Sequence, residues 1–171
     1  QRPISWTTTG TIPNVQLWYI DNSGPITITN VISNTGGISW TIPNDLSPDP
    51  NTNVRVWVEN TDDTTVKSAE SSAFKIKGAI SVSGPAGGQT LMVYHPTFQT
   101  NTYPITWTVT GSILNVKLEY STNDGGSYGT VAPPNTVVIA CGAPGVYTYT
   151  WQAPNVLSQA CWVKVSNNVD A

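Results

Sequence analysis

Apolar and polar residues alternate one by one along several short stretches of this chain. Residues 105–110 alternate Ile, Trp and Val with Thr, and residues 116–120 alternate apolar side chains with Lys117 and Glu119. Phe74 and Ile76 alternate with lysines in the same way. A period of two is the pattern of a β-strand that buries one face. No stretch has apolar residues at helical spacing, so we expect an all-β chain.

Turn-forming residues separate these stretches at short intervals. Gly, Pro, Asn, Asp and Ser cluster in five places, at residues 21–25, 34–37, 47–50, 123–126 and 133–135. These residue types favour tight turns. About seven short strands per 100 residues, divided by such turns, are typical of a β-sandwich.

The chain also contains an internal repeat. Four segments recur in the same order: residues 3–10 match 104–111, 14–19 match 115–120, 38–43 match 149–154, and 54–58 match 161–165. Each copy spans roughly the length of one sandwich domain, about 100 residues. We therefore predict two tandem immunoglobulin-like β-sandwich domains, residues 1–77 and 78–171.

The two copies contain different parts of the repeating unit. The second copy has an opening strand at residues 79–93 before its Trp107 segment, whereas the first copy starts directly at that segment. The first copy has a closing strand at residues 73–77, and the second copy stops before one. We expect each domain to lack an edge strand within this chain and to present an open edge. Either flanking repeats or a neighbouring subunit would supply the missing strand.

Charge is scarce in this sequence. Charged residues make up 10% of the chain and the formal net charge is −3, whereas soluble domains carry about 25% charged residues. The seven Lys and Arg residues are spread singly, which argues against nucleic acid as a partner. No apolar run of membrane-spanning length occurs, so we expect no membrane insertion.

Catalytic chemistry has little support in this composition. His95 is the single histidine and precedes a proline, which excludes most triads built on a histidine base. No Gly-rich loop opens a helix to hold a phosphate. We predict a protein that is not an enzyme and has no cofactor.

Four of the seven tryptophans lie on inward positions of the predicted strands. We interpret them as core, because a buried Trp contributes a large apolar area, although sugar stacking is an alternative. They are Trp6, Trp40, Trp107 and Trp151.

The other three tryptophans lie on outward positions. Trp18 is matched in the second copy by Glu119, and Trp57 is matched by Lys164. Trp162 is the corresponding outward residue of the second copy. Exposed Trp on one sheet face indicates a contact surface. We interpret the three as a subunit interface or a carbohydrate platform, with cover by long loops as the remaining alternative.

Both cysteines fall in the second copy. Cys161 lies on a predicted inward position, and Cys141 precedes it. A disulfide between them would contribute about 3 kcal/mol, and a pair of buried thiols is the alternative. A zinc site lacks enough ligands.

Two surface features suggest further chemistry. Glu59, Asp62 and Asp63 could offer oxygen ligands to Ca²⁺, although solvated loop charges are the commoner use of such residues. The many Ser and Thr residues suggest O-glycosylation, whereas no Asn-x-Ser/Thr acceptor for N-glycosylation occurs.

The repeated segments resemble immunoglobulin-like or fibronectin-III-like repeats of large secreted bacterial and archaeal surface proteins, and are similar to the fungal Ser/Thr-rich cell-wall family. The matching elements are Ile105 to Trp107, Gly111, Asn115 to Ser121, Asp124 to Gly126, Trp151 to Pro154, Cys161 to Val165, and Phe74 to Ile76. The first copy departs from this pattern with Val54 in place of Cys and with Asn22-Ser23 in the turn.

The resemblance implies an extracellular or cell-surface scaffold, such as an S-layer, sheath or filament, and brings no catalytic residues with it. Partners would then be copies of the chain or neighbouring repeats, joined through open edges and the Trp surface, with polysaccharide as a further partner. An adhesin or a carbohydrate-binding module is the alternative function.

Overall fold

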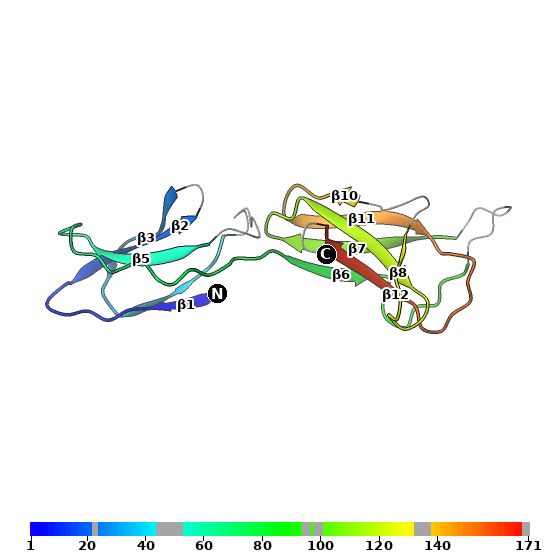
Figure 1. The fold of residues 1–171 in the computed structure, drawn as a ribbon, viewed down its shortest axis with the longest axis horizontal. Coiled ribbons are helices and arrows are strands. Elements are labelled where there is room, and N and C mark those ends of the chain that lie inside the picture. Colours follow the sequence, from blue (N-terminus) through cyan, green and yellow to red (C-terminus); the bar gives the residue numbers. More distant parts are fainter. Residues whose placement is uncertain (22–23, 44–52, 94–96, 98–100, 132–137, 169–171) are drawn as a thin grey trace. The chain divides into compact units, whose positions relative to one another are not determined.

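The computed structural model describes residues 1–21, 24–43, 53–93, 97, 101–131 and 138–168. All the regular elements in these residues are β-strands, and no helix occurs among them. The all-β prediction is therefore confirmed. The chain divides into two compact units, Gln1–Lys77 (the first unit) and Gly78–Ala171 (the second unit) (Figure 1).

The described residues of the first unit form five strands in two sheets. They are β1 (Arg2–Ser5), β2 (Asn14–Asp21), β3 (Gly24–Ser33), β4 (Gly37–Trp40) and β5 (Arg55–Asn60). Strand β1 pairs with β4, and the second sheet has the order β3-β2-β5; all pairs are antiparallel. Tyr19 of β2 and Trp40 of β4 pack together with Val54 in one core, so the two sheets face each other in a sandwich-like arrangement.

The outer side of β5 is covered by the chain that follows it. Residues 66–77, which we call the closing segment, run antiparallel to β5 but form only isolated bridges, at Glu59–Lys67 and Val54–Phe74. The closing strand predicted at residues 73–77 is thus present only as the Phe74 bridge. Ile76 nevertheless packs against the core of the first unit.

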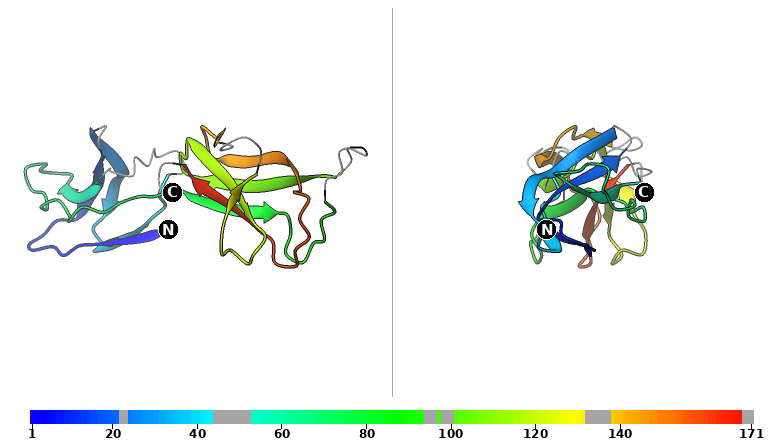
Figure 2. Two further views of the ribbon diagram at one scale, coloured as in Figure 1. Left: turned by 45° about the vertical axis from the view of Figure 1, so that its right-hand side comes forward. Right: turned by 90° about the vertical axis from the view of Figure 1, so that its left-hand side faces the viewer.

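Seven strands occur in the part of the second unit that the structure describes. They are β6 (Ala79–Gly84), β7 (Thr102–Thr110), β8 (Asn115–Ser121), β9 (Gly129–Thr130), β10 (Val138–Ala140), β11 (Gly145–Gln152) and β12 (Trp162–Asn167). One sheet has the order β11-β7-β6, and the other has the order β10-β8-β12, with β9 also paired to β8. Figure 2 shows these two layers from other directions. The opening strand predicted at residues 79–93 ends at Gly84, because Pro85 has no N–H to continue the pairing.

Side chains from both sheets of the second unit form a larger core. Ile105, Trp107 and Val109 of β7 meet Val116 and Leu118 of β8. These are the apolar positions of the alternating segments, so period two predicted the buried face correctly. Gly78, the first residue of this unit, lies close to the end of β7, since a Cβ there would lie 2.8 Å from the Thr110 carbonyl oxygen. Only glycine fits at that position.

Equivalent strands pair in the same register in the two units. Ile4 lies opposite Ile38 across β1 and β4, and their repeat matches Ile105 and Tyr149 lie opposite each other across β7 and β11. The flanking strands differ, however. Strand β7 has β6 on its second side, whereas β1 has only β4 as a partner among the described residues.

This difference in flanking strands changes burial at matched positions. Ile105 and Trp107 are 0% exposed, whereas Ile4 and Trp6 are only half-buried. The core interpretation holds for Trp40, Trp107 and Trp151, which are all buried. For Trp6 it is only partly correct, because no described strand covers that side of β1.

Candidate interaction surface

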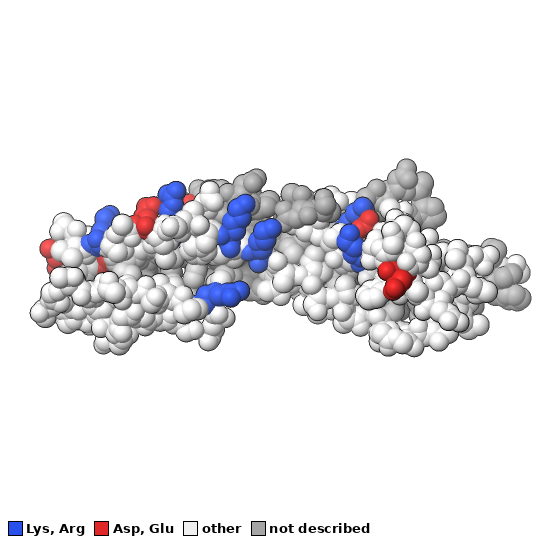
Figure 3. Space-filling view, turned by 60° about the horizontal axis from the view of Figure 1, so that its bottom comes forward, with Lys and Arg blue, Asp and Glu red and all other residues white. Residues whose placement is uncertain are grey.

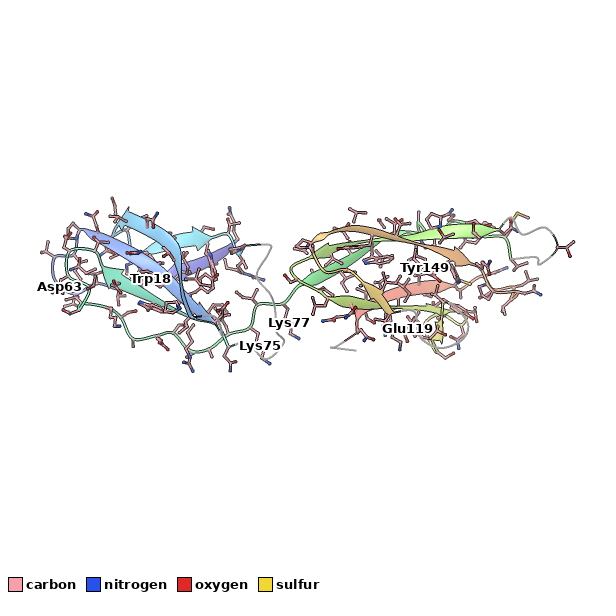
Figure 4. The ribbon with its side chains drawn as sticks, turned by 90° about the horizontal axis from the view of Figure 1, so that it is seen from above. Trp18, Asp63, Lys75, Lys77, Glu119 and Tyr149 are labelled. Carbon is pink, nitrogen blue, oxygen red and sulfur yellow. The ribbon has the colours of Figure 1, made fainter. Side chains whose placement is uncertain are left out.

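Trp18 and Trp57 lie directly opposite each other on the neighbouring strands β2 and β5. Val15, Leu17 and Tyr19 alternate with Trp18 and are buried, so both Trp side chains point to the outer face of the sheet. Their rings stack with centroids 6.1 Å apart and an angle of 8° between the planes. Figure 4 labels Trp18 on β2. The structure therefore brings together two of the three tryptophans predicted as a surface.

The stacked pair is half-buried rather than fully exposed. Each ring shields the other, and Thr27 of β3 is the neighbour of Trp18 on its second side. The indole N–H groups of Trp18 and Trp57 are both out of contact with solvent and have no hydrogen-bond partner within the described structure. A buried polar group without a partner has a free-energy cost.

Polar and apolar residues frame the pair on the same face. On one side of the Trp pair along the strands, Ile20 lies opposite Arg55, and on the other side Gln16 lies opposite Glu59. The Arg55 guanidinium forms an exposed ion pair of 3.2 Å with Glu70 of the closing segment. An aromatic centre with a polar rim is the usual layout of a protein contact surface.

The second unit replaces this aromatic pair with an ionic one. Glu119 of β8 and Lys164 of β12 are directly opposed, and their charged atoms are 3.2 Å apart. Lys117 also approaches Glu119, at 2.7 Å. The hydrogen bond from Lys117 lowers the pKa of Glu119 most, burial opposes this, and Lys164 lowers it further. The same sheet position is therefore apolar in the first unit and charged in the second.

Trp162 is the third predicted surface tryptophan and lies in the second unit. It is 55% exposed, and its indole N–H donates to the Asp124 carboxylate at 2.9 Å. Asp124 belongs to a tight turn in which the Ser121 hydroxyl accepts from the Gly125 N–H. Trp162 is thus anchored at one edge while its ring remains accessible.

The predicted disulfide between Cys141 and Cys161 is not formed; both thiols are free. Cys141 N–H bonds to the Leu114 carbonyl, at the start of β8, whereas Cys161 precedes Trp162, which pairs with Ser121 at the end of β8. That strand spans about 20 Å, well beyond the Cα separation that a disulfide bridges, roughly 7 Å at most.

Cys161 lies on the same face as Val163 and Val165, which pack against the core, but it is exposed rather than buried. Cys141, in contrast, is buried in the core. Burial raises the pKa of the Cys141 thiol, and the nearby Trp107 indole partly opposes this rise.

The three carboxylates proposed as calcium ligands do not converge. Among the described residues, no group of three or more His, Cys, Asp or Glu is placed to hold a metal ion. Asp63 instead accepts hydrogen bonds from the hydroxyl and the backbone N–H of Thr65, which lower its pKa. Glu59 lies on β5, where its backbone bridges to Lys67, and Asp62 donates its N–H to the Asn60 side chain.

One open depression occurs in the first unit, with a volume of about 520 Å³. Trp6 and Asn34 line it. The Asn34 side chain accepts from the Trp6 indole at 2.8 Å and donates to the Thr8 hydroxyl and the Ile12 carbonyl. These bonds hold the loop after β1 in place, so we interpret the site as structural. The sequence indicated only a turn at Asn34, because a side chain that makes several hydrogen bonds within a loop produces no periodic pattern in the sequence.

His95, the single candidate for a catalytic base, lies outside the described residues. Across the part of the chain that the structure describes, no helix is both long and apolar enough to cross a membrane.

Comparison with known proteins adds no assignment. The sequence matches no protein-family model, and no curated protein is significantly similar to it.

Proposed function

We propose that this chain consists of two immunoglobulin-like repeats and acts as a non-catalytic structural part of an extracellular surface assembly, such as a filament, sheath or S-layer. The observation that carries this proposal is the outward stacked pair, Trp18 and Trp57. A large aromatic pair on a solvent-facing sheet is a typical centre of a protein–protein contact.

The strand order supports the immunoglobulin-like assignment. In the second unit, β6, β7 and β11 form one sheet while β8, β10 and β12 form the other. This division matches two layers of an immunoglobulin-type sandwich, in which the first, second and fifth strands oppose the third and sixth. The first unit repeats the matched pairs β1–β4 and β2–β5.

The surface composition supports a structural role. Lys, Arg, Asp and Glu cover little of the face shown in Figure 3, in keeping with a chain that is only 10% charged. Weak charge repulsion allows many copies to approach closely. The Trp pair then supplies apolar area at the contact.

The second unit suggests a sharp test of the pair. Glu119 and Lys164 show that this sheet position accepts an ion pair, so the double variant Trp18→Glu with Trp57→Lys should fold. Wild-type material is expected to form ordered polymers visible by electron microscopy, and the double variant is expected to remain dispersed. Val31→Ser is the matched control, because Val31 is 61% exposed on β3 of the same sheet.

Far-ultraviolet circular dichroism would establish that the variants retain the fold. Unchanged polymers from a folded double variant would contradict the proposed role of the pair. Loss of polymers in both the double variant and Val31→Ser would mean that the effect is not specific to the tryptophans.

Carbohydrate binding is the second candidate, favoured by the parallel rings of Trp18 and Trp57. Flat aromatic faces stack on sugar rings, and the side chain of Gln16 on the same face could bond to hydroxyl groups. A pull-down on insoluble polysaccharides separates the two functions. Soluble monomers that are retained by the polysaccharide, and lose retention in the double variant, would favour this candidate over assembly.

A further inference from the structure

The closing segment makes a specific set of backbone bonds with the outer edge of β5. Val54 and Phe74 exchange two hydrogen bonds, of 2.8 and 2.9 Å. Ser71 donates its N–H to the Val56 carbonyl at 2.8 Å, and Ser68 donates to Val58 at the same distance. In an antiparallel strand, alternate residues bond to opposite sides. Val54, Val56 and Val58 therefore form the outward edge of β5.

Strand β12 is the counterpart of β5 and presents the same edge. Asn168 donates its N–H to Asn115, so the even-numbered residues of β12 bond to β8. By alternation, Val163 and Val165 direct their N–H and carbonyl groups away from β8. These two residues are the repeat matches of Val56 and Val58. Within the described residues, no strand is hydrogen-bonded to this side of β12.

Burial at the matched positions follows the presence of a covering segment. Val54 is 4% exposed, because it is paired with Phe74 and packed near Ile76. Its match, Cys161, is exposed. The same inward position is thus closed in the first unit and open in the second.

We propose that the open edge of β12 binds the closing segment of a second copy of this chain, in the register seen at β5. Phe74 of that copy would then lie opposite Cys161. The inference rests on the assembly function proposed above and deepens it, since it names the contacting elements. An added strand on an exposed sheet edge gains affinity from backbone bonds and register from its side chains.

The closing segment has the properties that such a donor needs. Its last part alternates apolar and cationic residues, with Phe74 and Ile76 apolar and Lys75 and Lys77 charged; Figure 4 shows both lysines on the chain beyond β5. Most of residues 66–77 are exposed, and the segment forms no continuous ladder with β5. Pairing with β12 would exchange its backbone bonds to β5 for equivalent bonds, because Val163 and Val165 present the same outward groups as Val56 and Val58.

Disulfide trapping tests both the pairing and its register. A synthetic peptide of residues 64–77 with Phe74→Cys, activated as a pyridyl disulfide, is mixed with the full chain. Hydrogen-bonded antiparallel partners have Cα atoms about 5.5 Å apart, within the range of a disulfide. We expect the peptide to couple to Cys161 at least roughly tenfold faster than the same peptide with Ala73→Cys, because pairing raises the effective concentration of the thiol. Release of the pyridine thione gives the rate, and peptide mapping identifies the cysteine.

Protein variants separate edge pairing from simple thiol reactivity. Val165→Pro removes one outward N–H and should abolish the rate advantage, while pairing with β8 is kept. Ala140→Pro is the matched control: Cys141 donates its N–H to Leu114, so by alternation the Ala140 N–H faces away from β8 at the other end of the same sheet. That variant should keep the advantage.

The outcomes distinguish this inference from the proposed function. Equal rates for the two peptides on the wild-type chain would overturn the inference, and this comparison needs no variant to fold. An unrelated alternating peptide that couples as fast would also overturn it, since the edge would then accept any strand. Polymers that form and depend on Trp18 and Trp57 would leave the assembly function standing in either case. Register-specific coupling without polymers would instead remove the assembly function alone.

Discussion

Glu119 occupies in the second unit the strand position that Trp18 occupies in the first, and each faces its cross-strand partner in the same register. One sheet geometry therefore carries an ion pair in one unit and an aromatic stack in the other. Neither pair is required by the fold, since the first unit forms with the aromatic pair and the second unit forms with the ion pair. The choice between them determines what the outer face can contact.

The aromatic stack should contribute measurable coupling energy. In a double-mutant cycle of Trp18→Ala and Trp57→Ala, we expect an interaction of about 0.5–1.5 kcal/mol, because parallel rings gain energy beyond their burial. Urea unfolding of the first unit, followed by circular dichroism, gives the four free energies. Strictly additive single effects would show that the rings stack without stabilising each other.

The Glu119 ion pairs should make the second unit sensitive to acid. The pKa of Glu119 is lower in the folded protein than its ordinary value of 4.5, so the ionised group favours the folded state. This stabilisation is complete above pH 4.5 and is lost as the pH falls through the lowered pKa. Glu119→Gln should remove that part of the pH dependence and cost about 1 kcal/mol at neutral pH, since both lysines are partly exposed.

Glu70→Gln provides the comparison for this acid effect. Its carboxylate pairs with Arg55 at an exposed site, so the substitution should change the stability little at any pH. Thermal unfolding of both variants between acidic and neutral pH measures the effect. A wild-type acid transition that persists unchanged in Glu119→Gln would contradict the assignment.

The matched residues Trp107 and Trp6 should differ in their effect on stability. Trp107 is 0% exposed, and Trp107→Ala is expected to cost about 3–5 kcal/mol through the cavity it leaves. Trp6 is half-buried and bonds to Asn34, so Trp6→Ala should cost less, roughly 1–3 kcal/mol. Denaturant unfolding tests the order of the two costs. Equal costs would mean that both positions are equally enclosed in solution.

The two cysteines should react with thiol reagents at very different rates. Cys161 is exposed, whereas Cys141 is buried and its thiol pKa is raised, which reduces the reactive thiolate. Under native conditions we expect iodoacetamide to add one label, at Cys161, and in denaturant to add two. Intact mass and peptide mapping give the count and the position. A native protein that takes up no label before reduction would restore the disulfide hypothesis.

Alternation and the internal repeat predicted much of this architecture because they record local geometry. Period two in residues 105–110 identified the buried face of β7, and the matched positions of Trp18 and Trp57 identified outward residues on neighbouring strands. Both inferences depend only on the direction of side chains along a strand. The placement of individual turns followed from Gly, Pro and Asn for the same reason.

Properties that depend on which segments meet in space could not be deduced in this way. The sequence placed Cys161 inward, but whether an inward position is closed depends on a neighbouring strand, and β12 has no hydrogen-bonded strand on that side within the described residues. The separation of Cys141 from Cys161 likewise depends on tertiary structure, because Cys141 lies beside the start of β8 and Cys161 lies beside its end.

The sequence by itself therefore determined the all-β character, the repeated segments and the direction in which most tryptophans point. Only the tertiary structure decided that Trp18 and Trp57 stack, that Glu119 joins two lysines, and that the closing segment covers β5 while no described strand is hydrogen-bonded to the outer edge of β12. The physical reason is that side-chain direction is a local property of the backbone, whereas burial and pairing require partners that are distant along the chain.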